Sequence, residues 1–108
     1  MSEPNRHYFD RWELRKDDIL IGTLNVYDQD MFWFTAHFVP TAAFEPYRAI
    51  FSEGEALVGE DGWYLWARKI NTLGMKLVRL DDQNVASEFI LYIKDEEASF
   101  RPVLDKYR

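Results

Sequence analysis

The most apolar stretch of the chain is Met31–Val39, MFWFTAHFV, in which only His37 is neither apolar, aromatic nor small. It is much shorter than the roughly 20 apolar residues that a membrane-spanning helix needs. A continuous apolar run of this length is typical of a buried strand. The pattern therefore predicts a central β-strand that is covered on both faces and ends at Pro40.

Two strands are predicted before this central one. Arg11–Lys16 alternates apolar and charged residues, as a half-buried strand does, and Asp17–Asp18 then supplies a turn. The second strand is Ile19–Tyr27. The polar residues Asp28–Asp30 separate it from the central strand and predict a three-residue hairpin loop.

That loop fixes the expected register of the hairpin, because a slip of one residue would set apolar against polar positions along the whole ladder. One face is then uniformly apolar or small, and the other is mixed. The predicted pairs are Val26–Phe32, Leu24–Phe34, Gly22–Ala36 and Leu20–Phe38 on the apolar face, and Tyr27–Met31, Asn25–Trp33, Thr23–Thr35 and Ile21–His37 on the mixed face.

Two helices are predicted next, since apolar residues recur there at helical spacing. The first begins at the N-cap Thr41 and ends near Gly54, or continues irregularly to Gly59. The second is capped by Asp61, and Gly74 lies where a left-handed C-cap belongs.

Three further strands complete the chain. Met75–Leu80 leads through a polar turn into Val85–Ile93, and the chain reverses again around Asp95–Glu96. Pro102 cannot donate to a ladder, so the last strand is expected to lie at an edge or to end there. The predicted pairs of this hairpin are Ile93–Ala98, Leu91–Phe100 and Phe89–Pro102.

These elements predict the order β-β-β-α-α-β-β-β. With short connections and one core, they favour an α+β fold: a curved antiparallel sheet or open barrel of about six strands, with two helices packed against it. The chain has 108 residues, of which 47% are hydrophobic, enough for one core. We predict a single globular domain over residues 1–108, frayed at residues 1–7.

Charge and cysteine content exclude several function classes. The net charge is −6, and the longest basic runs are the pairs Arg15–Lys16 and Arg68–Lys69, which argues against nucleic acid and anionic membranes as partners. The chain has no cysteine, hence no disulfide, thiol nucleophile or thiolate metal site. The first residues contain no apolar signal segment, so the expected location is cytoplasmic.

The sequence indicates no catalytic residue, metal site or cofactor. His7 and His37 are the two histidines, without the spacing of a zinc or iron site. The acidic pairs fall at predicted turns and helix ends, where carboxylates are usually solvated. No glycine-rich phosphate loop and no nucleophile elbow is present.

His37 leaves two interpretations open. It could be a general base or a ligand contact in a pocket, or a partly buried histidine that is satisfied by a neighbouring group. In the first case a pocket between the helices and the mixed face would hold a small molecule, and an arginine in it could bind an anion. Its predicted lining is Tyr27, Trp33, Thr35, His37 and Arg101.

The cluster Trp63-Tyr64-Leu65-Trp66 also has two interpretations. On a helix, Trp63 and Trp66 share the buried stripe and would fill the core, as most large aromatic side chains do. If part of the cluster is exposed, Trp63 and Tyr64 are candidates for contacting a protein partner, since Trp and Tyr dominate interface hot spots.

A set of hydrophobic and turn residues resembles a family of small bacterial α+β proteins of about this length. The resemblance implies the order of elements and a bacterial origin, and brings no activity or catalytic residue with it. Its residues are Leu14, Gly22-Thr23-Leu24, Asp30-Met31-Phe32-Trp33, Phe38-Val39-Pro40, Phe44, Phe89-Ile90-Leu91-Tyr92-Ile93, Ala98 and Phe100-Arg101.

We therefore expect a non-enzymatic binding or protein-interaction module, monomeric or homodimeric, that uses an aromatic sheet face or an open strand edge. The alternative is a small-molecule-binding or enzymatic domain with a pocket around His37 and Trp33.

Overall fold

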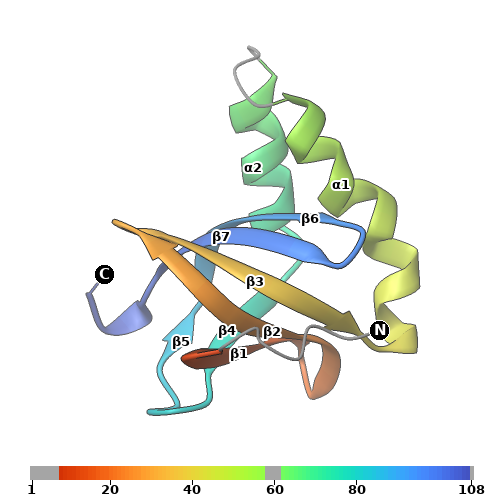
Figure 1. Ribbon diagram of the computed structural model, residues 1–108. Helices are drawn as coiled ribbons and strands as arrows, with labels where there is room; N and C mark the ends of the chain where they lie inside the picture. The colour runs from red at the N-terminus through yellow and green to blue at the C-terminus, as the bar shows by residue number, and fades with distance from the viewer. Residues whose placement is uncertain (1–7, 58–61, 108) are drawn as a thin grey trace.

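The computed structural model describes residues 8–57 and 62–107 and has an antiparallel sheet with two α-helices beside it (Figure 1). The strands are β1 (Asp10–Lys16), β2 (Ile19–Asp30), β3 (Trp33–Pro40), β4 (Met75–Arg79), β5 (Val85–Ala86), β6 (Glu88–Lys94) and β7 (Glu97–Val103). The helices are α1 (Arg48–Leu57) and α2 (Trp63–Asn71), with the 3₁₀ segments η1 (Ala42–Tyr47) and η2 (Asp105–Tyr107). None of the described helices is both long and apolar enough to cross a membrane.

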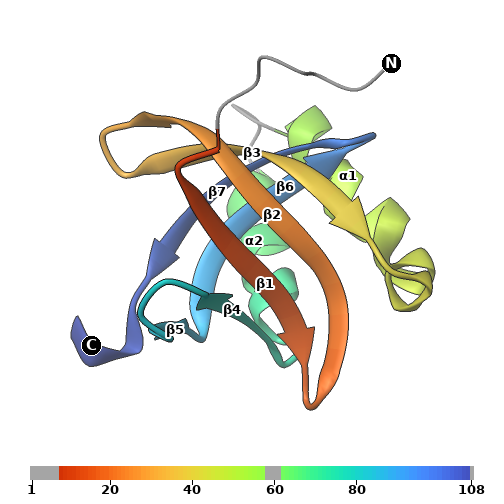
Figure 2. The same ribbon diagram turned by 60° about the horizontal axis from the view of Figure 1, so that its bottom comes forward.

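The sheet is a nearly closed barrel of seven strands in the order β5-β4-β1-β2-β3-β7-β6 (Figure 2). β5 and β6 are the two edges of this order, and the single residue Ser87 joins them. The two edges therefore meet at one point of the chain. The α+β fold with its open barrel is as predicted from the sequence, with one strand more than expected.

The extra strand arises because the predicted strand Val85–Ile93 changes partner in its middle. β5 pairs with β4, whereas β6 pairs with β7. Between them, the backbone N–H of Ser87 donates to Asp105 Oδ1 at 2.8 Å, and its hydroxyl donates to Asp105 Oδ2 at 2.8 Å. A carboxylate thus takes the hydrogen bond that a continuous strand would give to its neighbour.

The predicted central strand is central, since β3 lies between β2 and β7. The expectation that its whole aromatic run is covered is wrong at one end. Met31 and Phe32 form the two-residue turn between β2 and β3, and their side chains are 78% and 66% exposed. Further along β3, Ala36 and Phe38 point inward and are buried.

The predicted register of the β2–β3 hairpin is also wrong. Val26 lies opposite Ala36 rather than Phe32, a shift of four residues, and a bulge follows between Val26 and Asp28. The turn lies at Met31–Phe32 instead of at the three polar residues before it. Because the shift is even up to Val26, the pairs in this part keep their predicted faces, but Ile21, expected on the mixed face, is buried in the core.

Two consequences of the corrected register concern individual residues. His37 lies opposite Asn25, not Ile21. Gly22 lies opposite Pro40, not Ala36, and the ring of Phe38 packs where a side chain would begin. A Cβ atom at Gly22 would be 2.4 Å from Cζ of that ring, so only glycine fits at this position without a local shift.

The helices follow the predicted capping in part. The Thr41 hydroxyl accepts a hydrogen bond from the N–H of Ala43, but the segment that it caps is the 3₁₀ segment η1. α1 then continues through Gly54 to Leu57, so the first of its two predicted ends is wrong, and the second, Gly59, lies outside the described residues. Gly74 has a φ of 77°, the expected left-handed conformation, in the turn between α2 and β4. The predicted cap Asp61 lies outside the described residues.

The last hairpin has the predicted register, with Ile93–Ala98, Leu91–Phe100 and Phe89–Pro102 opposite one another. β7 is not an edge strand, however, since β3 pairs with it over Glu97–Phe100. Pro102 lies beyond this paired part. Its missing N–H therefore costs the ladder with β3 nothing.

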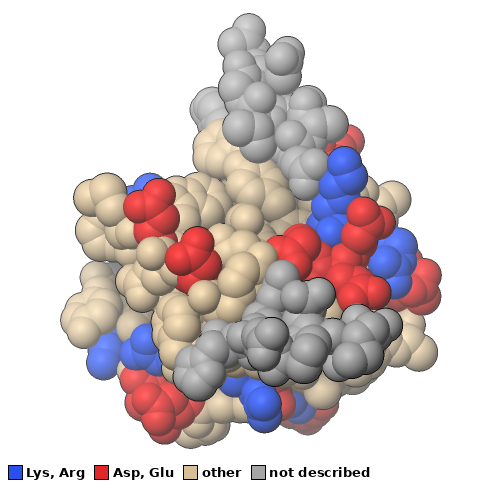
Figure 3. Space-filling model, in the orientation of Figure 1, with Lys and Arg blue, Asp and Glu red and all other residues tan. Residues whose placement is uncertain are grey.

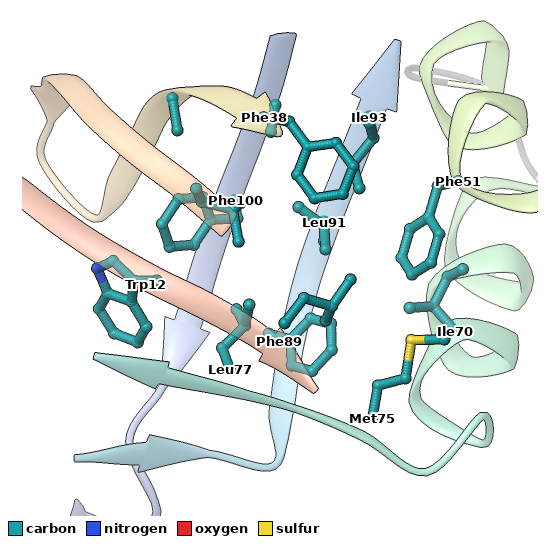
Figure 4. Packing of buried hydrophobic residues seen from close by; sticks show 14 of the residues in the cluster. Trp12, Phe38, Phe51, Ile70, Met75, Leu77, Phe89, Leu91, Ile93 and Phe100 are labelled. Atoms are coloured by element: carbon teal, nitrogen blue, oxygen red, sulfur yellow. The ribbon is translucent and has the colours of Figure 1, made fainter. Parts of the chain in front are cut away.

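One core runs from the inside of the barrel to the helices (Figure 4). Trp12 and Phe100 lie at one end of it, and Leu91 lies in the middle. At the other end, Phe51 from α1 and Ile70 from α2 cover the strands, and both are almost completely buried. The helices thus close one side of the barrel and leave the end beyond Trp12 open.

Candidate functional site

An apolar hollow of about 350 Å³ lies at this open end of the barrel. The turn between β2 and β3 forms one side of it, and the C-terminal residues 101–104 and η2 form another. In Figures 1 and 2 this turn and the C-terminal segment both lie at the left of the molecule. The volume lies in the range of small-molecule binding sites.

The floor of the hollow is a cluster of aromatic rings. The Trp12 and Phe34 ring centroids are 6.1 Å apart, and Phe100 meets Trp12 edge to face at 5.5 Å. The indole N–H of Trp12 donates to Asp10 Oδ2 at 3.0 Å, so the polar atom of this floor has a partner. The floor is therefore rigid and apolar, and has no unmet hydrogen bond.

The rim of the hollow consists of large apolar side chains in contact with solvent. Met31, Phe32 and Tyr107 are mostly exposed, and Val103 is 39% exposed. Such side chains, gathered around a hollow rather than scattered singly, mark binding surfaces in soluble proteins. Met31 also has a φ of 57°, a left-handed conformation that only glycine adopts freely.

Two arginines are the charged groups that line the hollow. Arg79 donates to Asp82 Oδ2 at 2.7 Å, and its guanidinium lies 5.4 Å from the Trp12 ring centroid. This hydrogen bond raises the pKa of Arg79 and holds the pKa of the Asp82 carboxyl well below its usual range. The positive charge of Arg79 is thus already neutralised within the molecule.

Arg101 is different. Its guanidinium carbon lies 5.4 Å from the centroid of the Phe32 ring, and its side chain is exposed. Among residues 8–57 and 62–107, no carboxylate lies within ion-pair distance of it. The N–H donors of this side chain therefore remain available beside an apolar cavity.

Of the five ligand contacts predicted from the sequence, two lie beside the turn between β6 and β7. Tyr27 donates a hydrogen bond to Glu97. The Nε2 atom of His37 lies 3.1 Å from Glu96 Oε1, and its Nδ1 atom lies 3.2 Å from the Tyr8 hydroxyl. Both ring nitrogens of His37 have partners, as the interpretation of a satisfied histidine expects.

The other three lie elsewhere. Thr35 is half-buried on the outer face of β3, where it lies opposite Asp28 of β2 and Ser99 of β7. Trp33 stacks on an aromatic ring of β6, and Arg101 lines the hollow at the open end of the barrel. The structure does not gather the five residues in one pocket, and their role as ligand contacts stays a prediction.

The hollow next to His37 has a volume of about 510 Å³ and a different character. Charged residues of both signs line it, Arg48 on one side with Asp95 and Glu96 on the other. Trp33 is not part of its lining. This hollow offers a ligand fewer apolar contacts than the one at the open end.

Two of the aromatic residues predicted as contacts, Trp33 and Trp63, both contact Tyr92 on the outer face of β6. The Tyr92 ring is parallel to those of Trp66 at 5.1 Å and Trp33 at 5.8 Å, and Trp63 donates a hydrogen bond to its hydroxyl. Burial raises the pKa of Tyr92. In Figure 3 the area between α2 and the sheet is tan, with acidic side chains on both sides of it.

This cluster joins α2 to the sheet. The Trp66 indole N–H also donates to the Ile50 carbonyl at 2.7 Å, so Trp66 belongs to the core. Trp63 is half-buried and has its partner within the molecule. The side chain of Tyr64 lies outside the described residues. Contact of Trp63 and Tyr64 with a protein partner stays a prediction.

Sequence reasoning missed most of the hollow, including Met31, Phe32, Arg79 and Tyr107. The turn was expected at the polar residues 28–30, which placed Met31 and Phe32 inside a buried strand. No glycine or asparagine marks the real turn. The available signal was the length of the apolar run, which contains more residues than one buried strand needs.

Among residues 8–57 and 62–107, no three or more His, Asp or Glu side chains are grouped to hold a metal ion. Comparison of the chain with models of protein families, with curated proteins and with solved structures finds no match in any of the three. The resemblance to a family of small bacterial proteins stays a prediction.

Proposed function

We propose that this protein is a non-enzymatic binding module that takes up an apolar, preferably aromatic, small molecule at the open end of its barrel. One observation carries the proposal: exposed apolar side chains from two distant parts of the sequence surround a hollow with an aromatic floor. Covering these side chains with a ligand would remove apolar surface from water, at roughly 25 cal/mol per Å².

The two sides of the hollow support this function differently. The floor, with Trp12 and Phe34, is packed and hydrogen-bonded before any ligand arrives. The rim, with Phe32 and Tyr107, is exposed and offers apolar surface to the side of a bound ring. A preformed floor lowers the entropy cost of binding, and the exposed rim adds contact area.

The first prediction tests this function with a neutral aromatic probe, naphthalene-2-carboxamide, in a calorimetric titration. We expect saturable binding with one site per chain, and Phe32→Ala should weaken it about tenfold because an aromatic contact is lost. Leu65→Ala is the matched control, since Leu65 is 63% exposed on α2, away from the hollow. It should leave the affinity unchanged.

Two results would overturn the proposal. One is the absence of saturable binding to the wild-type protein. The other is an equal effect of the two substitutions, which would mean that the probe adheres to any exposed apolar residue.

Light scattering on the same samples measures self-association and so tests the expected homodimer.

A further inference from the structure

We infer that the ligand at the open end of the barrel carries a carboxylate, and that Arg101 binds it. This inference rests on the proposed binding function and specifies the ligand class of the same site. The molecule as a whole has a net charge of −6 and would repel an anion. The attraction must therefore be local.

The charged residues that line the hollow are basic, whereas Asp10 and Asp82 contact its lining residues Trp12 and Arg79 from outside. Its lining residues include Arg79 and Arg101 and no Asp or Glu. Just outside, the Lys106 ammonium lies 5.1 Å from the centroid of the lining residue Tyr107. Beside the Arg79–Asp82 pair, Arg101 and Lys106 thus place positive charge next to this apolar hollow, where it attracts an anion.

Arg101 is the one of the two lining arginines that can bind a ligand directly. The guanidinium of Arg79 is bound by both oxygens of Asp82, at 3.2 and 2.7 Å. Arg101 instead lies against the Phe32 ring, which holds the guanidinium at the rim without using its N–H donors in an ion pair. A planar guanidinium with free donors matches a carboxylate, which it can bind with two parallel hydrogen bonds.

The chemistry of the ligand follows from these two halves of the site. An aromatic or apolar body would lie on Trp12 and Phe34 under Phe32, and a carboxylate at its end would reach Arg101 at the rim. Size limits the class as well, because a hollow of about 350 Å³ accepts a small molecule and no folded chain.

The test compares naphthalene-2-carboxylate with its neutral isostere, naphthalene-2-carboxamide, in calorimetric titrations at low salt. We expect the wild-type protein to bind the carboxylate roughly three- to tenfold more tightly than the amide. Arg101→Gln should remove this preference, so that the variant binds the carboxylate and the amide with equal affinity. Arg68→Gln, at an exposed arginine on α2, is the matched control and should keep the preference.

The outcomes separate the inference from the proposed function. If neither probe binds, the proposed function fails and the inference fails with it. If both probes bind equally, or if Arg101→Gln keeps the preference, the inference alone is overturned. A preference that shrinks as salt is added supports an ionic contact at the rim, and one that is insensitive to salt contradicts it.

Discussion

Met31 shows at the scale of one residue how this molecule departs from the usual rules of folding. Two-residue hairpin turns favour glycine or asparagine, because their first central residue needs a positive φ. Here a methionine with a φ of 57° occupies that position, and 78% of its side chain is exposed. Burial of the Met31 side chain does not offset this backbone strain. Residues held in strained conformations concentrate at binding sites.

The second prediction follows from this strain. Met31→Gly should raise the free energy of unfolding by about 0.5–1 kcal/mol, since relief of left-handed strain exceeds the added chain entropy of glycine. The same substitution should weaken binding of naphthalene-2-carboxamide, because one apolar side chain of the rim is lost. Urea unfolding and calorimetry measure the two effects. A variant that is less stable than the wild type and binds the amide with the same affinity would contradict a link between the strain at Met31 and the binding site.

At the scale of elements, the ring of Tyr92 fastens helix α2 to the sheet. It stacks between Trp66 of α2 and Trp33 of β3, and its hydroxyl accepts a hydrogen bond from Trp63. Burial favours the neutral phenol and raises its pKa above the ordinary value of 10.0. The contact between helix and sheet therefore depends on a group that titrates at alkaline pH.

The third prediction concerns this pH dependence. Because the folded pKa is the higher one, the unfolded chain loses its proton first as the pH rises. The contribution of Tyr92 to stability is therefore complete below about pH 10 and is lost as the pH rises through the folded pKa. Urea unfolding at a series of alkaline pH values should show a shallower loss of stability for Tyr92→Phe than for the wild-type protein.

At neutral pH the same substitution should cost about 1 kcal/mol, because the ring stack remains and only the hydrogen bond from Trp63 is removed. Tyr107→Phe is the matched control, since Tyr107 is 74% exposed and takes no part in this cluster. Identical alkaline slopes for Tyr92→Phe and the wild type would show that folding does not raise the pKa of Tyr92, and unchanged stability at neutral pH would show that its hydroxyl does not fasten the helix.

At the scale of the whole molecule, the barrel and the helices share one core. Phe100 lies under the open end and Phe51 lies under α1, and both are completely buried (Figure 4). β6 connects them, since it is in contact with both α1 and β7. The two ends of the molecule should therefore unfold together, as expected of a single domain of this size.

The fourth prediction tests this cooperativity by calorimetry. Phe100→Ala and Phe51→Ala should each lower the free energy of unfolding by about 3–5 kcal/mol and lower the midpoint of one common transition. That loss is a large part of the roughly 5–15 kcal/mol that stabilises a typical domain. Two separate transitions, of which each substitution lowers only one, would contradict the prediction of a single domain over residues 1–108.

The fold was largely predictable because its signals are local and repeat along the chain. Alternation in Arg11–Lys16, helical spacing after Thr41 and the pairing of Leu91 with Phe100 each depend on a few neighbouring residues. The register of the β2–β3 hairpin was not predictable in this way. Over Gly22–Val26 the shift is even and keeps paired side chains on the same face, so the hydrophobic pattern alone cannot distinguish the two pairings there.

The sequence by itself determined the class of fold, the order of the elements and which face of most strands is buried, because these depend on the period of apolar residues. Only the tertiary structure decided where the aromatic residues meet solvent. Phe32 and Tyr107 are 75 positions apart in sequence, and closure of the barrel brings them to the same hollow beside Arg101. A binding site of this kind depends on which ends of the strands coincide in space, and no local pattern in the chain carries that information.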